Sequence, residues 1–140
     1  MQKVLLRVYG AENTGKTTSI SAAFDQFKER HPYATCVLPY QKDGHGDILV
    51  AVGLRKIFVG FSSNGDKPTV IKKNLHKLHE NNCDIIVCAS RPDDNTAKAV
   101  EKFNEQLDDE YRIEPYPVRR DSNDAVAIVN FIDDYIANNS

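Results

Sequence analysis

Several features that would assign this protein to a class at once are scarce or missing in its sequence. Only three of the 140 residues are cysteines (Cys36, Cys83 and Cys88), an odd and sparse set that provides no disulfide framework. No window approaches the roughly 18 apolar residues that a transmembrane helix requires. The formal net charge of −2 argues against a protein built mainly to neutralise nucleic acid. These absences predict a cytoplasmic domain with reduced thiols and no membrane association.

Internal repeats, low-complexity segments and a targeting pattern are also missing. The chain enters a strand pattern directly at Lys3–Tyr9, so we expect no signal peptide. A length of 140 residues suits one domain with a core of its own. We therefore expect residues 1–140 to form a single domain.

What the sequence does contain is one glycine-bounded stretch, Gly10-Ala11-Glu12-Asn13-Thr14-Gly15-Lys16-Thr17. It fits the pattern G-x-x-x-x-G-K-[ST] at every fixed position. The run Lys3–Tyr9 before it predicts a strand, and after it Ile20, Phe24 and Phe27 recur at helical spacing. Strand, glycine-bounded loop and helix are the context in which this pattern predicts a phosphate-binding loop.

The residue types of this stretch explain the chemistry expected of it. The first N–H groups of a helix have no partner inside the helix, and with the aligned peptide dipoles they form a positive site for an anion. Gly10 and Gly15 permit backbone angles and close approaches that a Cβ would block. Lys16 is expected to lie near the outer phosphates of a nucleoside triphosphate, and Thr17 to ligate Mg²⁺. Thr18 adds a second hydroxyl. The alternative is a glycine-containing turn with an exposed lysine and no ligand.

On these residues the chain resembles the P-loop nucleoside triphosphate hydrolase superfamily, in its kinase-like branch. The resemblance implies an acidic residue at the end of another strand, which holds Mg²⁺ directly or through water. Here no apolar strand ends immediately in Asp. The run that ends at Phe61 passes through Ser62-Ser63-Asn64-Gly65 before it reaches Asp66, which we favour as the catalytic and metal-assisting acid. Asp66 could instead cap the following helix, and Asp47, after Gly44-His45-Gly46, is the other candidate acid.

Three arginines follow predicted strands. Arg91 comes directly after the apolar run Asp84–Ser90, where a cation can stabilise a transferring phosphoryl group or an anionic substrate. The alternative for Arg91 is a surface position beside Pro92. Arg119 and Arg120 follow the last predicted strand. In kinases of this superfamily the corresponding loop lies near the nucleotide base, so the resemblance implies that these two flank the base or lie on the surface.

Strand and helix patterns alternate along the chain, which predicts a three-layer α/β/α sandwich with a mainly parallel sheet of five or six strands. The resemblance implies that this sandwich has the P-loop NTPase fold. A short connection containing Gly53 between two apolar runs predicts a β-hairpin, and therefore one antiparallel strand. The predicted strands are Lys3–Tyr9, Thr35–Leu38, Ile48–Val52, Lys56–Phe61, Asp84–Ser90 and Arg112–Val118. The predicted helices are Lys16–Arg30, a helix with Pro68 in its first turn, Asp93–Leu107 and Ser122–Ala137.

Ligands of such sheets bind at the carboxyl ends of the strands. This rule selects four candidate segments: Tyr40–Asp47, Ser62–Asp66, Ser90-Arg91 and Arg119-Arg120. We expect Mg²⁺-dependent binding of a nucleoside triphosphate there. ATP is favoured over GTP, because the N-K-x-D signature of GTP-selective members is missing.

Three kinds of protein fit this prediction. The first is an NTPase or kinase-like phosphotransferase with an unknown acceptor, in which Lys16, Asp66 and Arg91 act on the phosphates. The second is a nucleotide-binding regulatory or partner-interaction module with little turnover, and the third binds another phosphorylated ligand. The interval Phe103–Glu110 is acidic and contains no arginine, unlike the arginine-rich lid of small-molecule kinases in this superfamily.

Overall fold

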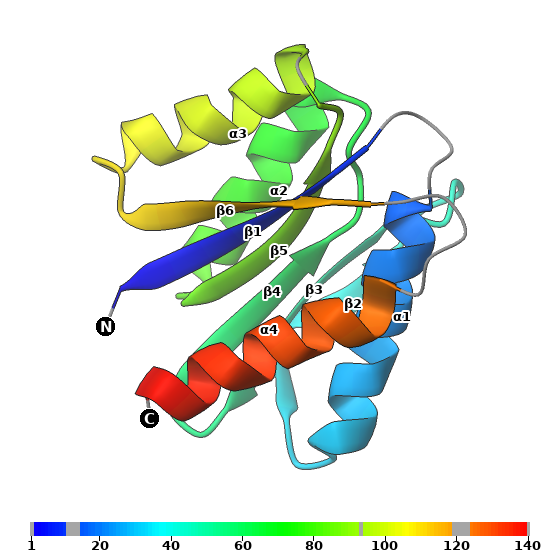
Figure 1. Ribbon diagram of the computed structural model, residues 1–140, viewed down its shortest axis with the longest axis vertical. Helices are drawn as coiled ribbons and strands as arrows, with labels where there is room; N and C mark the ends of the chain where they lie inside the picture. The colour runs from blue at the N-terminus through cyan, green and yellow to red at the C-terminus, as the bar shows by residue number, and fades with distance from the viewer. Residues whose placement is uncertain (1, 11–14, 93, 119–123, 140) are drawn as a thin grey trace.

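The computed structural model describes residues 2–10, 15–92, 94–118 and 124–139 (Figure 1). Strands and helices alternate through these residues as the sequence predicts. The elements are β1 (Lys3–Tyr9), α1 (Lys16–Arg30), β2 (Thr35–Lys42), β3 (Ile48–Leu54), β4 (Ile57–Ser62), α2 (Pro68–Glu80), β5 (Ile85–Ser90), α3 (Asn95–Gln106), β6 (Tyr111–Pro117) and α4 (Asp124–Asn139). None of the helices in the described ranges is long and apolar enough to cross a membrane.

The strands form one six-stranded sheet in the order β2-β3-β4-β5-β1-β6. β1 pairs in parallel with β5 and β6, and β4 pairs in parallel with β5. β3 pairs antiparallel with both β2 and β4, so it runs against the other strands. The α/β class, the mainly parallel sheet and the antiparallel hairpin strand are therefore confirmed.

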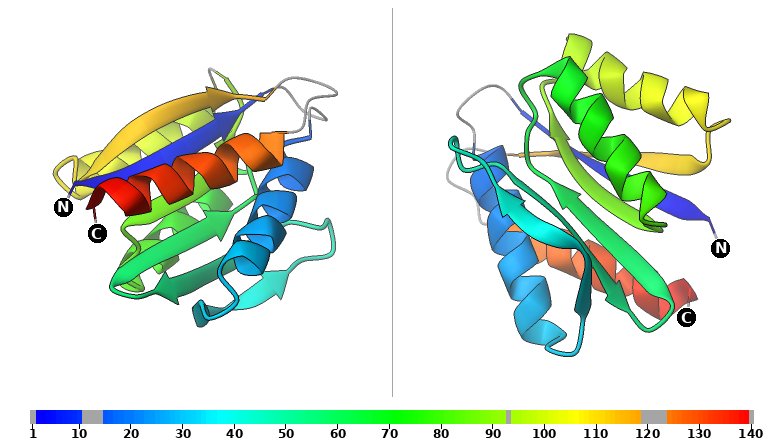
Figure 2. Two further views of the ribbon diagram at one scale, coloured as in Figure 1. Left: turned by 60° about the horizontal axis from the view of Figure 1, so that its bottom comes forward. Right: turned by 180° about the vertical axis from the view of Figure 1, so that it is seen from behind.

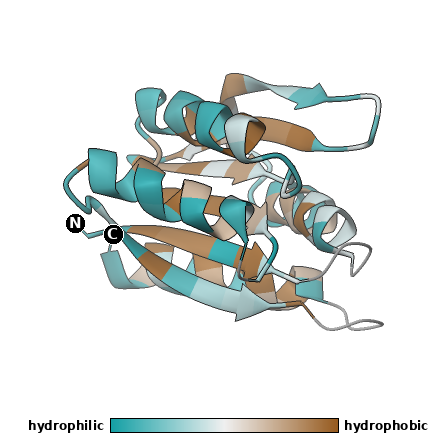
Figure 3. Cartoon of the chain, turned by 90° about the horizontal axis from the view of Figure 1, so that it is seen from above, coloured by the Kyte–Doolittle hydropathy of each residue, from teal (hydrophilic) through white to brown (hydrophobic). Residues whose placement is uncertain are grey.

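Helices cover both faces of this sheet and complete the three predicted layers (Figures 1 and 2). α1 and α4 pack on one face, and α2 and α3 pack on the other. Side chains of β1 alternate between the two cores: Val4 and Leu6 belong to the α1/α4 side and Leu5 to the α2/α3 side. This alternation is the period of two that any strand imposes, and it explains why β1 carries apolar side chains on both of its faces. Figure 3 shows the resulting apolar strands between helices with polar outer surfaces.

The second strand is longer than the sequence predicts, because it continues through Pro39 to Lys42 instead of ending at Leu38. β2 lies at an edge of the sheet, where a residue without an N–H is tolerated. Its pairing with β3 shifts register between Cys36 and Leu38 and again between Leu38 and Gln41. The predicted polar loop is therefore shorter, and it is a tight turn from Asp43 to Asp47.

The direction of β3 decides which residues meet at the carboxyl edge of the parallel strands. β1, β4 and β5 end at this edge, whereas the antiparallel strand β3 begins there. The residue directly before β3 is Asp47, so it lies at the same edge as the residues that follow β4 and β5. α1 and α2 also begin at this edge (Figure 2).

Candidate functional site

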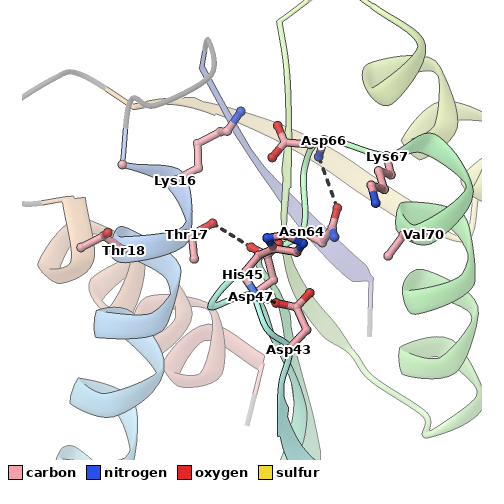
Figure 4. Close-up of a pocket in the computed structure, with 11 residues that line it drawn as sticks. Lys16, Thr17, Thr18, Asp43, His45, Asp47, Asn64, Asp66, Lys67 and Val70 are labelled. Carbon is pink, nitrogen blue, oxygen red and sulfur yellow. Dashed lines mark hydrogen bonds between the residues drawn. The ribbon is translucent and has the colours of Figure 1, made fainter.

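A pocket of about 740 Å³ lies at the carboxyl edge of the sheet, between the first turns of α1 and α2 (Figure 4). Three segments supply its walls: the start of α1, the β2–β3 turn and the β4–α2 connection. The lining residues are Gly15, Lys16, Thr17, Thr18, Asp43, His45, Asp47, Asn64, Asp66, Lys67 and Val70. Gly15, Lys16 and Thr17, the end of the stretch that the sequence predicts to bind phosphate, therefore line this pocket. Ala11, Glu12, Asn13 and Thr14 lie outside the described residues, as do Arg119 and Arg120.

The start of α1 is built around Gly15, which has a left-handed backbone with φ of +91°. A side chain in this conformation is strained even though nothing lies within 4 Å of the place where a Cβ would be. The carbonyl of Gly15 accepts the N–H of Ser19 at 2.8 Å in the first turn of the helix. Gly15 therefore turns the chain from the loop directly into a helix whose N-terminus faces the pocket.

Lys16 follows as the first residue of α1, and only 6% of it is exposed. Its ammonium donates a hydrogen bond to the carbonyl oxygen of Gly10 at 2.8 Å. Gly10 itself donates its N–H to the carbonyl of Ser90 at the end of β5, at 3.3 Å. Lys16 thereby ties the two ends of the glycine-bounded stretch together at the carboxyl edge.

Thr17 contacts an acidic side chain. Its hydroxyl donates a hydrogen bond to Oδ1 of Asp47 at 2.8 Å. Ser63, which is 1% exposed, donates to the same oxygen at 3.3 Å and accepts the N–H of Ile48 at 2.8 Å. The carboxylate of Asp47 is therefore held against the hydroxyl that the sequence predicts as a Mg²⁺ ligand.

The acid beside Thr17 is thus Asp47 and not Asp66, the acid that the sequence favoured. Asp66 lines the same pocket, but its Oδ1 lies 3.5 Å from Nε of Arg91. The interpretation of Asp66 as the cap of α2 is wrong, because the residue in the capping position is Lys67, which makes no side-chain cap hydrogen bond. The physical reason for the difference is strand direction: β3 begins at the carboxyl edge and delivers Asp47 there.

Arg91 lies where the sequence places it, at the end of β5, but it is not among the residues that line the pocket. Its guanidinium lies 3.5 Å from Asp66 and 3.7 Å from Asp94. Its backbone N–H donates to the hydroxyl of Thr96 at 2.8 Å, in the first turn of α3. In this structure Arg91 therefore joins the β4–α2 connection to the start of α3, and its role toward phosphate stays a prediction.

The sequence did not single out His45, although it selected the segment that contains it. The turn is closed by the carboxylate of Asp43, which accepts the N–H groups of His45 at 2.8 Å and Asp47 at 2.9 Å. Slight burial acts in the opposite direction, but these two hydrogen bonds prevail and lower the pKa of Asp43 below its ordinary value. The signal that could have identified His45 is its place in the turn that leads into the antiparallel strand.

The oxygen atoms of Thr17 and Asp47 are the donors that suit Mg²⁺, which binds through one or two carboxylates and completes its shell with water and phosphate oxygens. The described residues contain no group of three or more His, Cys, Asp or Glu side chains that could hold a metal ion. No cysteine lines the pocket, and Cys83 and Cys88 are buried, which raises the pKa of each thiol to about 12. A cation at this pocket would therefore need ligands besides the side chains of Thr17 and Asp47.

Comparison of the chain with protein-family models, with curated proteins and with solved structures found no match.

Proposed function

We propose that this protein binds a nucleoside triphosphate together with Mg²⁺ in the pocket between α1 and α2, with ATP favoured over GTP, and that its sheet and helices are a version of the P-loop NTPase fold. The observation that carries the proposal is the 2.8 Å hydrogen bond between the hydroxyl of Thr17 and the carboxylate of Asp47. The sequence pattern requires such a hydroxyl directly after its lysine, and the resemblance implies an acid from another strand beside it.

Each part of the α1 wall has a role in this proposal. The first turn of α1 lines the pocket from Gly15 to Thr18, and its N–H groups would hold phosphate oxygens. Lys16 is buried, so its charge would act on the phosphates through little intervening water. Thr17 and Asp47 would hold Mg²⁺, which neutralises charge on the outer phosphates when it is bound.

The balance of charge around the pocket favours a metal-bound nucleotide over a free one. Two lysines, Lys16 and Lys67, face three carboxylates, Asp43, Asp47 and Asp66. A free triphosphate would add several negative charges to this set, whereas Mg²⁺ would offset two of them. We therefore expect nucleotide binding to depend on Mg²⁺.

The first test is thermal or chemical unfolding of the protein with ATP or GTP, each with and without Mg²⁺. A ligand at a hundredfold excess over its Kd stabilises the folded state by about 2.7 kcal/mol, which such a measurement detects readily. We expect this stabilisation with Mg–ATP, a large reduction when EDTA removes the metal, and none in Lys16→Ala. Lys73→Ala is the matched control, since it removes the same charge from an exposed position on α2 outside the pocket.

The proposal fails if neither Mg–ATP nor Mg–GTP stabilises the unmutated protein. It also fails if Lys16→Ala and Lys73→Ala respond alike. A nucleotide-binding regulatory module with little turnover remains the second candidate. The observation in its favour is that Arg91, the cation predicted to act in catalysis, does not line the pocket and lies 3.5 Å from Asp66 and 3.7 Å from Asp94.

A further inference from the structure

Arg7 places a charge in the interior of β1, between the buried residues Leu6 and Val8. Side chains of a strand alternate between its two faces, so Arg7 shares with Leu5 the face that α2 and α3 cover. A guanidinium that is partly removed from water must have hydrogen-bond partners, because an unpaired charge is costly to bury. An apolar side chain would fill this position without that requirement. Packing alone therefore does not account for an arginine here.

The guanidinium of Arg7 holds the end of β5. Its Nη1 donates hydrogen bonds to the hydroxyl of Ser90 at 2.8 Å and to the carbonyl oxygen of Arg91 at 3.4 Å. The hydroxyl of Ser90 is fully buried and donates to the same carbonyl oxygen at 2.9 Å. The guanidinium carbon lies 4.8 Å from the ring centre of Tyr9, which limits where the side chain of Arg7 can go. Arg7 thus fixes the last residue of β5 by three connected hydrogen bonds.

The end of β5 in turn holds the first residue of the glycine-bounded stretch. The carbonyl of Ser90 accepts the N–H of Gly10 at 3.3 Å, and the carbonyl of Gly10 accepts a hydrogen bond from the ammonium of Lys16 at 2.8 Å. An ammonium has three N–H groups, so Lys16 can keep this hydrogen bond while it donates to a phosphate oxygen. A continuous series of hydrogen bonds therefore runs from Arg7 through Ser90 and Gly10 to Lys16.

We propose that Arg7 is a positioning residue for phosphate binding, an inference that rests on the proposed function. Arg7 does not line the pocket, and it lies on the face of the sheet opposite α1. It acts on the ligand through the end of β5: Arg7 fixes Ser90, Ser90 fixes Gly10, and Gly10 fixes the ammonium of Lys16. A side chain that is held in place before the ligand arrives loses little conformational freedom on binding, so this arrangement strengthens the affinity for phosphate.

The test measures the Kd of Mg–ATP by calorimetry in Arg7→Met, Ser90→Ala and the double variant. Arg7→Met keeps an unbranched side chain without its donors, and Ser90→Ala removes the hydroxyl that links Arg7 to β5. A hydrogen bond to a charged group changes an equilibrium by about 10–100-fold. Because Arg7 acts indirectly, we expect each single variant to raise the Kd by about 10-fold, the lower end of this range. The double variant should bind no more weakly than Arg7→Met, since both substitutions break the same series of hydrogen bonds.

Two further variants separate the hydrogen bonds of Arg7 from its charge and from its effect on stability. Arg7→Lys retains a cationic donor and should recover part of the affinity that Arg7→Met loses. Arg112→Met is the matched control, because Arg112 lies on the neighbouring strand β6, is 56% exposed and pairs with Glu114 at 3.0 Å outside the pocket. It should leave the Kd unchanged. Melting curves without nucleotide report stability, and each Kd is measured below the melting transition of its variant.

The inference is overturned if Arg7→Met lowers the melting temperature and leaves the Kd unchanged, which is the result expected of a merely structural residue. An unchanged Kd in Ser90→Ala, or additive losses in the double variant, overturns it as well, because Arg7 would then act through its charge alone. If Arg7→Met does not fold, the Kd of Ser90→Ala decides. These outcomes leave the proposed binding function intact, whereas failure of the unmutated protein to bind Mg–ATP overturns both.

Discussion

Two connections meet at the candidate site, and they reach the same edge of the sheet by opposite routes. The β4–α2 connection leaves the end of a parallel strand and runs on to α2, carrying Asp66 with it. The β2–β3 turn closes on itself and leads into the start of an antiparallel strand, carrying Asp47. Asp47 lies 2.8 Å from the hydroxyl of Thr17, whereas Asp66 lies 3.5 Å from Arg91.

The difference shows which acids a sheet of this kind can deliver to a ligand. Parallel strands bring the residues that follow them to the carboxyl edge, and an antiparallel strand brings the residues that precede it. The two routes are joined through Ser63, which follows β4 and whose hydroxyl contacts both Asp47 and the N–H of Ile48. The position of Asp47 therefore depends on the end of one strand and the beginning of another.

The first prediction tests which of the two acids, Asp47 or Asp66, supports Mg²⁺-dependent binding, and we expect the largest effect here. Asp47→Asn should weaken the Mg²⁺-dependent part of nucleotide binding by at least about 10-fold, because removal of a group that only supports a metal ligand already costs about 10–100-fold. Asp66→Asn removes the same charge from the same pocket and should leave the Mg²⁺ dependence close to that of the unmutated protein. The measurement is a titration of each variant with ATP at several Mg²⁺ concentrations.

Equal losses of Mg²⁺-dependent nucleotide affinity in Asp47→Asn and Asp66→Asn would contradict the proposal that Asp47 is the acid that holds Mg²⁺. A loss in Asp66→Asn alone would restore the acid that the sequence favoured. Asp25→Asn is the control for the change in net charge, because Asp25 is exposed on α1 outside the pocket.

Much of the fold could be predicted from the sequence because each element carries a local signal. The apolar residues of β1, the helical spacing of Ile20, Phe24 and Phe27, and the glycine near the end of β3 are each signals that depend on neighbouring residues alone. The end of β2 could not be predicted in this way. Pro39 normally argues against a strand interior, and only the position of β2 at the sheet edge, which is a tertiary property, makes it acceptable there.

The candidate site was predictable in part for the same reason. Lys16 and Thr17 belong to a pattern of fixed local spacing, so their place at the pocket follows from the pattern. The partner of Thr17 lies 30 positions along the chain, and its choice depends on strand order and direction. The sequence does predict that this hairpin strand is antiparallel. An antiparallel strand begins at the carboxyl edge, so its direction makes Asp47 a stronger candidate than Asp66 for the acid beside Thr17.

The second prediction compares one substitution in the two connections. A Cβ at Gly65 would lie 2.9 Å from both the carbonyl carbon and the Cβ of Ala89, and 3.1 Å from the nitrogen of Ser90. Since most of these atoms are backbone and cannot move aside cheaply, Gly65→Ala should cost about 1–3 kcal/mol in unfolding free energy. A Cβ at Gly44 meets nothing within 4 Å, so Gly44→Ala should stay within about 0.5 kcal/mol of the unmutated protein.

Chemical denaturation of the two variants measures this contrast. If Gly44→Ala lowered the unfolding free energy as much as Gly65→Ala does, the β2–β3 turn would be packed as closely as the β4–α2 connection. A measurement of Mg–ATP binding by each variant distinguishes a local change at the pocket from a change in overall stability. We expect Gly44→Ala to bind Mg–ATP normally, because the substitution leaves the hydrogen bonds of the turn in place.

The third prediction concerns pH and has the smallest expected effect, because Asp43 is largely exposed. Its pKa is lowered in the folded protein, so the folded state binds fewer protons than the unfolded state as this carboxyl titrates. The stability that Asp43 contributes is therefore fully present above its unfolded pKa of about 3.9 and is lost as the pH falls through the folded pKa. Asp43→Asn should flatten the loss of unfolding free energy between about pH 5 and pH 3, measured by urea denaturation at each pH. An unchanged slope in Asp43→Asn would mean that the hydrogen bonds from the N–H groups of His45 and Asp47 do not lower the pKa of this carboxyl.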